Sequence, residues 1–449
     1  LLQGGMAVGS DGVQQQELEV ALARFRSLLD REEIDSRQEH PPTTIYTPWV
    51  VVWLMVYQRL HGNASLSDAV IELFRIKERL PPNRRITEET LSTNTGSYSV
   101  ARTRLNPEVA EAVSDHVFQT LMESSSPSWE DRRVFLFDGT TSALTSIDRL
   151  RQEFPPATNQ HRRSPWPILH WAVAHELSSA CAMRPEVGAK YGPAAVSEVT
   201  LALRLLERLP LNSVIMADRN FGVFAFFHAA QAAGHEVVTR LTKARFGALR
   251  KRARPLAPGR WELCWKPSAA ERRKHPELSA DDYVNVELHE VEVVTSEGET
   301  LTLYIATTLI TDGRKLADLY GLRFNVETDI RNVKVVLRMD ELRGQSRSML
   351  RKELALGTVA YNLVIQIRRL AAQQAGLPPR RLSFSGSWSL VKILLLDPVK
   401  WTTDAFLQNF RFVLRGCAQR KLPNRPGRKY PRQVLRRSQK YAYRARPPN

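Results

Sequence analysis

Two short apolar runs that each end in an aspartate constrain the fold most strongly. Residues 134–137 are followed by Asp138, and residues 214–217 are followed by Asp218. Runs this short and this apolar are typical of strands buried on both faces of a sheet. The residues between them alternate first like a strand and then show the leucine spacing of a helix. The chain is therefore predicted to form an α/β fold whose sheet carries two carboxylates at strand ends.

An aspartate at the end of a strand also has an ordinary structural role. Gly139 and Thr140 make a capped turn plausible directly after Asp138. Asp218 could likewise cap a helix predicted over residues 221–233. On these residues alone a cap is the commoner role, but the repetition of one architecture favours a site.

A third carboxylate lies in the polar stretch of residues 320–334. Viewed along the axis of an α-helix, four of its polar residues point in directions within about 60° of one another, whereas its apolar residues point in other directions. They are Tyr320, Arg323, Glu327 and Lys334. A glutamate can bind a divalent metal, arginine and lysine can hold phosphate oxygens, and tyrosine can contact a phosphate or a base. The stripe therefore suits a phosphodiester site, with an exposed helix carrying chance ion pairs as the alternative.

The spacing of these four residues resembles the signature of bacterial insertion-sequence transposases of the insertion-sequence-4 family. Two, three and six residues separate its successive members, as they do here. The resemblance extends over about residues 132–376 and departs at Phe324, where the family usually has tryptophan. Because phenylalanine keeps the aromatic packing surface, this departure changes little.

The resemblance implies a ribonuclease H-like catalytic core of the Asp-Asp-Glu class. Asp138 matches the family's first acid, which lies in a hydrophobic-Asp-Gly-Thr context, and Asp218 matches the second, in Asp-Arg-x-aromatic. Together with Glu327 they are the expected catalytic residues and the expected ligands of two Mg²⁺ or Mn²⁺ ions. Two such ions can activate an attacking oxygen and stabilise the leaving one, and carboxylate oxygens suit them.

The activity implied is metal-dependent strand cleavage at transposon ends and strand transfer to target DNA, by cutting and pasting through a hairpin. Tyr320, Arg323 and Lys334 are the expected DNA-binding residues. The expected partners are double-stranded DNA, as terminal inverted repeats and as target, and a second copy of the chain in the synaptic complex. A DNA-binding derivative that no longer cuts, or another ribonuclease H-like nuclease, is the alternative.

The sequence patterns predict three regions. Residues 1–130 are expected to form an N-terminal helical domain that could bind DNA ends. Residues 131–376 are the expected catalytic domain, and the resemblance places a β-rich insertion at about residues 243–300. Residues 377–449 form a basic C-terminal region that is expected to end in a flexible tail.

Two basic segments are candidate DNA contacts. Arg102 and Arg104 belong to a segment that resembles one in the family's N-terminal region, and a plain helical scaffold is the alternative there. From Cys417 onward the chain carries arginine, lysine and tyrosine without an acid, which is typical of a nucleic-acid-contacting arm.

The overall charge favours a polyanionic partner. The formal net charge is +17 over 449 residues, so nucleic acid is the first candidate. No stretch approaches about 18 apolar residues, and the most apolar one, residues 47–60, is expected to be a buried helix. The three cysteines suggest neither a zinc site nor a disulfide framework. A cytoplasmic, nucleoid-associated protein that does not bind membranes is expected.

Overall fold

The computed structural model of the chain describes residues 19–423, apart from residues 21–22, 26, 78–79, 81–82, 159–162, 295–297 and 396–402. The expected basic tail from residue 424 lies outside the described residues. One ten-stranded sheet crosses the described part, in the order β2-β3-β1-β5-β6-β10-β9-β8-β7, with β4 paired to β3. Its strands are β1 (Val134–Ala143), β2 (Pro156–Thr158), β3 (Arg163–Glu176), β4 (Glu186–Ala189), β5 (Val214–Ala217), β6 (Glu236–Arg240), β7 (Arg254–Ala257), β8 (Arg260–Trp265), β9 (Val284–Val294) and β10 (Thr300–Thr307).

The centre of the sheet mixes parallel and antiparallel pairs. β1 is antiparallel to β3 on one side and parallel to β5 on the other, and β6 continues the parallel run. This order and direction are consistent with a ribonuclease H-like core. The predicted α/β class is therefore confirmed, and both aspartate-terminated runs are central strands buried along their apolar residues.

The expected β-rich insertion extends this sheet. β10 pairs with β6, and β9, β8 and β7 follow it edge to edge. Trp265 is 4% exposed and packs against Phe224 and Phe227, and Trp261 packs edge-on against Phe246. These tryptophans belong to the packing of the extension.

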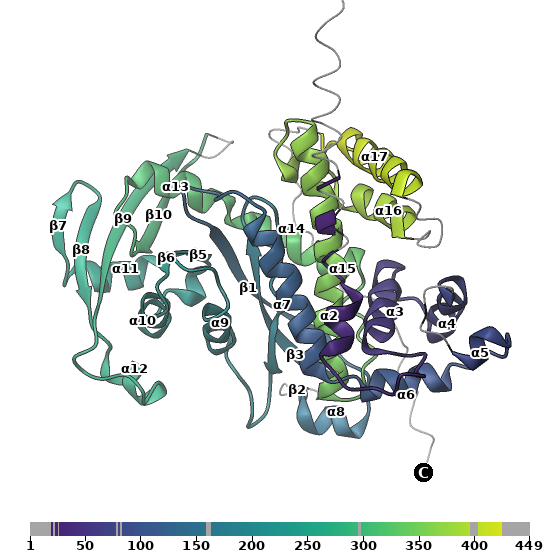
Figure 1. The fold of residues 1–449 in the computed structure, drawn as a ribbon. Coiled ribbons are helices and arrows are strands. Elements are labelled where there is room, and N and C mark those ends of the chain that lie inside the picture. Colours follow the sequence, from purple (N-terminus) through teal and green to yellow (C-terminus); the bar gives the residue numbers. More distant parts are fainter. Residues whose placement is uncertain are drawn as a thin grey trace, which may run out of the picture.

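Helices cover the sheet and continue beyond it (Figure 1). No described helix is long and apolar enough to span a membrane. The helices before β1 are α2 (Arg31–Ser36), α3 (Pro48–Leu60), α4 (Leu66–Arg75), α5 (Arg84–Thr87), α6 (Gly96–Arg104) and α7 (Pro107–Glu123). Those after it are α8 (Asp148–Glu153), α9 (Glu198–Leu206), α10 (Phe224–Ala232), α11 (Lys243–Arg250), α12 (Ala269–Lys274), α13 (Gly313–Gly321), α14 (Asn325–Arg331), α15 (Arg347–Gln374), α16 (Phe384–Leu395) and α17 (Thr403–Gln419).

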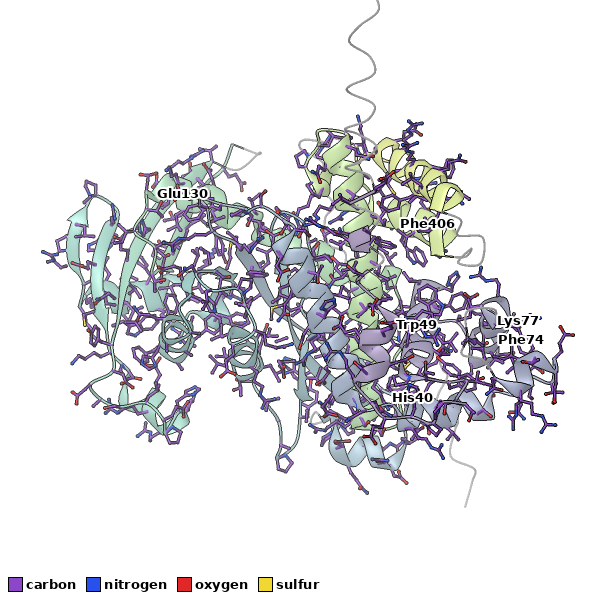
Figure 2. The ribbon with its side chains drawn as sticks, viewed as in Figure 1. His40, Trp49, Phe74, Lys77, Glu130 and Phe406 are labelled. Carbon is purple, nitrogen blue, oxygen red and sulfur yellow. The ribbon has the colours of Figure 1, made fainter. Side chains whose placement is uncertain are left out.

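The apolar stretch before residue 60 is the buried helix α3, as predicted. It begins at Pro48 after the N-cap Thr47, whose side chain accepts a hydrogen bond from the Val50 amide. The loop before β1 contacts α13, because Lys315 donates to the carboxylate of Glu130 at 2.9 Å. Glu130 is labelled in Figure 2 beside this helix.

The three cysteines, Cys181, Cys264 and Cys417, are free.

The long helix α15 joins the sheet to the N-terminal helices. In Figure 1 it stands as a column between the sheet and α3, and it packs against α7, α3, α16 and α17. Most of its length is buried, and the buried residues include polar ones such as Lys352, Asn362 and Gln366. The helices before β1 are therefore anchored to the same core as the sheet.

Three consecutive residues of α15 make this anchor polar and specific. Arg351 pairs with Glu111 and Glu108 of α7, at 2.7 and 3.0 Å. Lys352, only 1% exposed, donates to the carbonyls of residues 102, 103 and 105 at the end of α6. Glu353 accepts from the amides of residues 343 and 344.

Arg102, a candidate phosphate contact, is turned toward this anchor. Its guanidinium lies 3.1 Å from the Glu353 carboxylate, and its side chain is 14% exposed. This placement favours the alternative of a helical scaffold over direct phosphate contact for Arg102.

We expect Lys352→Met to destabilise the protein by about 2 to 4 kcal/mol, because three buried carbonyls lose their donor. Urea unfolding at pH 7 measures the change, and Lys274→Met on the exposed face of α12 is the matched control, expected to stay within about 0.5 kcal/mol. Equal stability of the two variants would contradict the anchoring role of Lys352.

A neutral histidine is buried where β3 meets α15. Both ring nitrogens of His175 are buried without a hydrogen-bond partner, and its ring packs edge-on against Tyr361 at 5.8 Å. Burial lowers the pKa of His175 from 6.5 to about 4; Asp329 opposes this shift, while the Arg380 guanidinium adds to it. The folded state therefore requires the uncharged imidazole.

Because the folded pKa lies below the unfolded one, the stability that neutral His175 provides is present above pH 6.5 and is lost as the pH falls toward 4. Between pH 7 and pH 5 this group alone should cost about 2 kcal/mol of unfolding free energy. His175→Leu should show a loss smaller by that amount in urea unfolding at the two pH values, whereas His275→Leu should keep the wild-type difference. An unchanged pH dependence in His175→Leu would show that this imidazole does not resist protonation.

Candidate active site at the edge of the central strands

Asp138 lies inside β1, not at its end. The predicted end of the strand at Asp138 is wrong, and the alternative of a turn at Gly139 and Thr140 is absent, since β1 continues to Ala143 through its antiparallel pairing with β3. The parallel pairing with β5, however, stops at Leu136. The strand is therefore opened on one side just before Asp138, and burial falls from complete to partial at that residue.

Asp218 follows β5 at this same opening. Its carboxylate caps the short 3₁₀ turn Arg219–Phe221 by accepting from the Asn220 amide at 2.7 Å. The helix cap considered from the sequence is absent, because α10 begins after Val223 without a side-chain cap. The cap on the 3₁₀ turn does not exclude a site, because the pKa of Asp138 is raised by burial and also by the charge of Asp218.

The sequence pattern predicts one regular α-helix over the signature stretch, residues 320–334, and this prediction is wrong. α13 ends at Gly321, a 3₁₀ turn spans Leu322–Phe324, α14 follows, and a π-helical turn spans Asn332–Val336. The tight turn and the wide turn change the rotation per residue, so the calculated stripe does not hold along the whole stretch. Tyr320, for example, is buried in the last turn of α13.

The same segment nevertheless brings its arginine between two of the predicted acids. The Arg323 guanidinium lies 3.7 Å from Asp138 Oδ2 and 3.6 Å from Glu327 Oε1. Its side chain is only 11% exposed and lies over the Phe324 ring, with 4.9 Å from the guanidinium carbon to the ring centroid. Two acids that are far apart in the sequence thus flank one cation.

The other two signature residues contact protein groups beside the acids. Lys334 Nζ donates to Thr140 Oγ1 at 3.1 Å and to the Thr141 carbonyl at 2.6 Å, two and three residues beyond Asp138. Tyr320 is 6% exposed, and burial raises its pKa to about 12. In this conformation its ring packs in the core and offers no free face to a base.

A fourth carboxylate, that of Glu198 at the start of α9, lies close enough to Asp138 and Asp218 for their charges to act on it. Burial, followed by the charges of Asp138 and Asp218, raises the pKa of Glu198 to about 7. Burial is also the main reason why the pKa of Asp138 is raised, with Asp218 and Glu327 adding to it and Arg323 opposing it. No sequence pattern identifies Glu198 as a site residue, because an acid in the first turn of a helix is common.

The sheet order and the carboxylates gathered at this opening define a protein of the Asp-Asp-Glu class. A family model described as "Transposase DDE domain" matches residues 129–363. The chain belongs to this transposase family. It is also 25% identical, over 398 residues, to the transposase InsG for insertion sequence element IS4 of Escherichia coli (strain K12), covering 87% of this chain and 86% of that protein. The predicted membership of the insertion-sequence-4 family is confirmed.

The donors at this opening fit a divalent cation by their chemistry. Carboxylate oxygens are the ligands that Mg²⁺ and Mn²⁺ prefer. Burial, and after it the charges of neighbouring acids, raise the pKa of Asp138 and Glu198, and a bound cation would oppose this effect by stabilising the ionised carboxylates. Within the described residues no three acidic, histidine or cysteine side chains are already arranged to hold a metal. Arg323 lies between Asp138 and Glu327 instead, so coordination requires these side chains to draw together.

Arg323→Gln should destabilise the metal-free protein by about 1 to 2 kcal/mol, because the acids then face one another without the intervening cation. Urea unfolding in the presence of EDTA measures this. The control is Arg331→Gln, an exposed arginine of the same segment, for which little change is expected. If both variants lose the same stability, the guanidinium is not held by the acids.

Proposed function

We propose that this transposase cleaves DNA strands at the ends of its element and joins the freed 3′ ends to target DNA. The observation that carries the proposal is the convergence of Asp138, Asp218 and Glu327 on one opening of the sheet, with Arg323 between two of them. Three carboxylates from separate elements suit two Mg²⁺ or Mn²⁺ ions better than a simple ion pair.

In this proposal Asp138, Asp218 and Glu327 would hold the two ions through their carboxylate oxygens. When bound, the ions supply the activation of the attacking oxygen and the stabilisation of the leaving oxygen. The central strands support the proposal, because pairing with β3 holds the backbone of Asp138, and pairing of β1 with β5 up to Leu136 brings the end of β5, which Asp218 follows, beside it.

The cations of the signature segment position the phosphodiester in this proposal. Arg323 exchanges a carboxylate for a phosphate oxygen when DNA enters, and Lys334 holds the adjacent phosphate from its place beside Thr140. Tyr320 supports the segment from the core, and any contact of its hydroxyl with DNA is secondary. The arrangement suits positioning, since a small displacement of the reacting phosphate is costly in rate.

The course of transposition is proposed from the family. The element is excised through a hairpin at each end and pasted into target DNA, with two copies of the chain holding paired ends. The net charge of +17 supports contact with two DNA partners. The helices before β1 are the proposed contact with the terminal repeats, and the C-terminal region beyond residue 376 adds non-specific contacts.

The test is a gel assay on a duplex that carries one terminal inverted repeat of the element, with Mg²⁺ present. Asp138→Asn, Asp218→Asn and Glu327→Gln should each lower cleavage by about 1,000-fold or more, because they remove metal ligands. DNA binding should stay near the wild-type level. Bound, nicked and hairpin species are separated for each variant.

Asp148→Asn is the matched control, because this acid on α8 lies in the same region of the chain and its side chain is 91% exposed. It should cleave like wild type. Near wild-type cleavage by any of the three site variants removes that residue from the site, and binding without cleavage by the wild-type protein would indicate a silent derivative.

A further inference from the structure

The carboxylate of Glu198 lies directly against the backbone of β1 at the residue after Asp138. A Cβ built on Gly139 would stand 2.3 Å from Glu198 Oε1 and 2.5 Å from its Cδ. No side chain fits between the two elements. α9, whose N-cap Ser197 accepts from the Thr200 amide, holds Glu198 in its first turn at this position.

This contact explains the glycine of the Asp-Gly-Thr motif. Gly139 is not in the left-handed region and lies within a continuous strand, so neither a turn nor an unusual φ requires it. A glycine inside a strand often marks a close approach by another group. Here that group is the Glu198 carboxylate, which reaches the strand only because residue 139 lacks a side chain.

The two oxygens of Asp138 face different neighbours. Oδ2 is the atom nearest to Arg323, at 3.7 Å, whereas Oδ1 accepts from the Gly139 amide at 2.8 Å. The Gly139 amide also interacts with the Glu198 carboxylate. The Glu198 carboxylate therefore approaches β1 at the residue directly after Asp138, at the opening where pairing with β5 has ended.

A nearby cation compensates the charges of Asp138 and Glu327, but not that of Glu198. Arg323 approaches Asp138 and Glu327, but among the described residues no cationic group lies within 4 Å of the Glu198 carboxylate. Lys190 acts on it from a longer distance and is itself 3.4 Å from His170 Nε2. A partly buried carboxylate beside a second one, without a close cation, is unfavourable unless a further cation binds.

We propose that Glu198 is a fourth carboxylate of the cation site and would hold a divalent ion together with Asp138. This inference rests on the proposed function, since it presupposes that Asp138 binds metal. The competing explanation is that Glu198 only stabilises the N-terminus of α9, as acids in a first turn commonly do. In that case its removal would change stability and leave metal affinity unchanged.

The test is a Mn²⁺ titration of the full chain without DNA, followed by the electron paramagnetic resonance signal of free Mn²⁺. Glu198→Gln should weaken the binding of one ion by about 10- to 100-fold. Glu207→Gln, at the other end of α9 and exposed, is the control and should bind like wild type. Thermal unfolding in EDTA verifies that each variant is folded.

The outcomes separate this inference from the proposed function. If Asp138→Asn loses Mn²⁺ binding and Glu198→Gln keeps wild-type affinity, the fourth ligand is overturned and the proposed site stands. If the wild-type protein binds no Mn²⁺, or Asp138→Asn binds like wild type, both proposals fail. If Asp138→Asn and Glu198→Gln weaken binding while Glu207→Gln does not, Glu198 is a ligand.

A second variant tests the position of the carboxylate without removing it. Gly139→Ala should displace Glu198 and weaken Mn²⁺ binding about as much as Glu198→Gln does. The double variant should be no weaker than either single one, because both changes remove the same contact. Wild-type affinity in Gly139→Ala would overturn the inference that the approach to β1 places Glu198 at the ion.

Discussion

The gathering of negative charge at one opening of the sheet is the constraint on which the rest of the structure depends. Asp138 becomes available because β5 stops pairing with β1 while β3 continues, so the strand is held on one side and open on the other. Like charges in a partly buried place repel, and this repulsion has to be opposed by a cation or by protonation. Arg323 supplies part of that opposition, which explains why an arginine is buried to this extent beside a surface site.

The strands and helices that carry the acids are packed into one core, and this packing resists the repulsion. The acids come from a strand, a strand end and two helices, and none of these elements is an isolated loop. α15 completes the framework, since Arg351, Lys352 and Glu353 connect α7, the end of α6 and the segment before α15. These three charged residues thus hold helices together.

Local patterns predicted much of this protein, and tertiary context decided the rest. The apolar runs before Asp138 and Asp218 identified two central strands, because burial on both faces leaves a clear composition. The predicted end of the strand at Asp138 was wrong, because pairing with β3 continues the strand in spite of the turn preference of Gly139. The regular helix over the signature stretch was wrong because a 3₁₀ turn and a π turn have no distinct sequence pattern. Glu198 was missed, since only the fold reveals that it meets Gly139.

The continuous sheet has a mechanical consequence for the extension formed by β7 to β10. Because β10 pairs with β6 and β9 pairs with β10, backbone hydrogen bonds run without interruption from the strands of the active site to the far edge. A unit joined in this way bends and twists with the sheet and has no hinge about which it can swing. A force on the extension is therefore transmitted directly to the backbones of β6 and β5, so the extension and the strands that carry the acids behave as one elastic body.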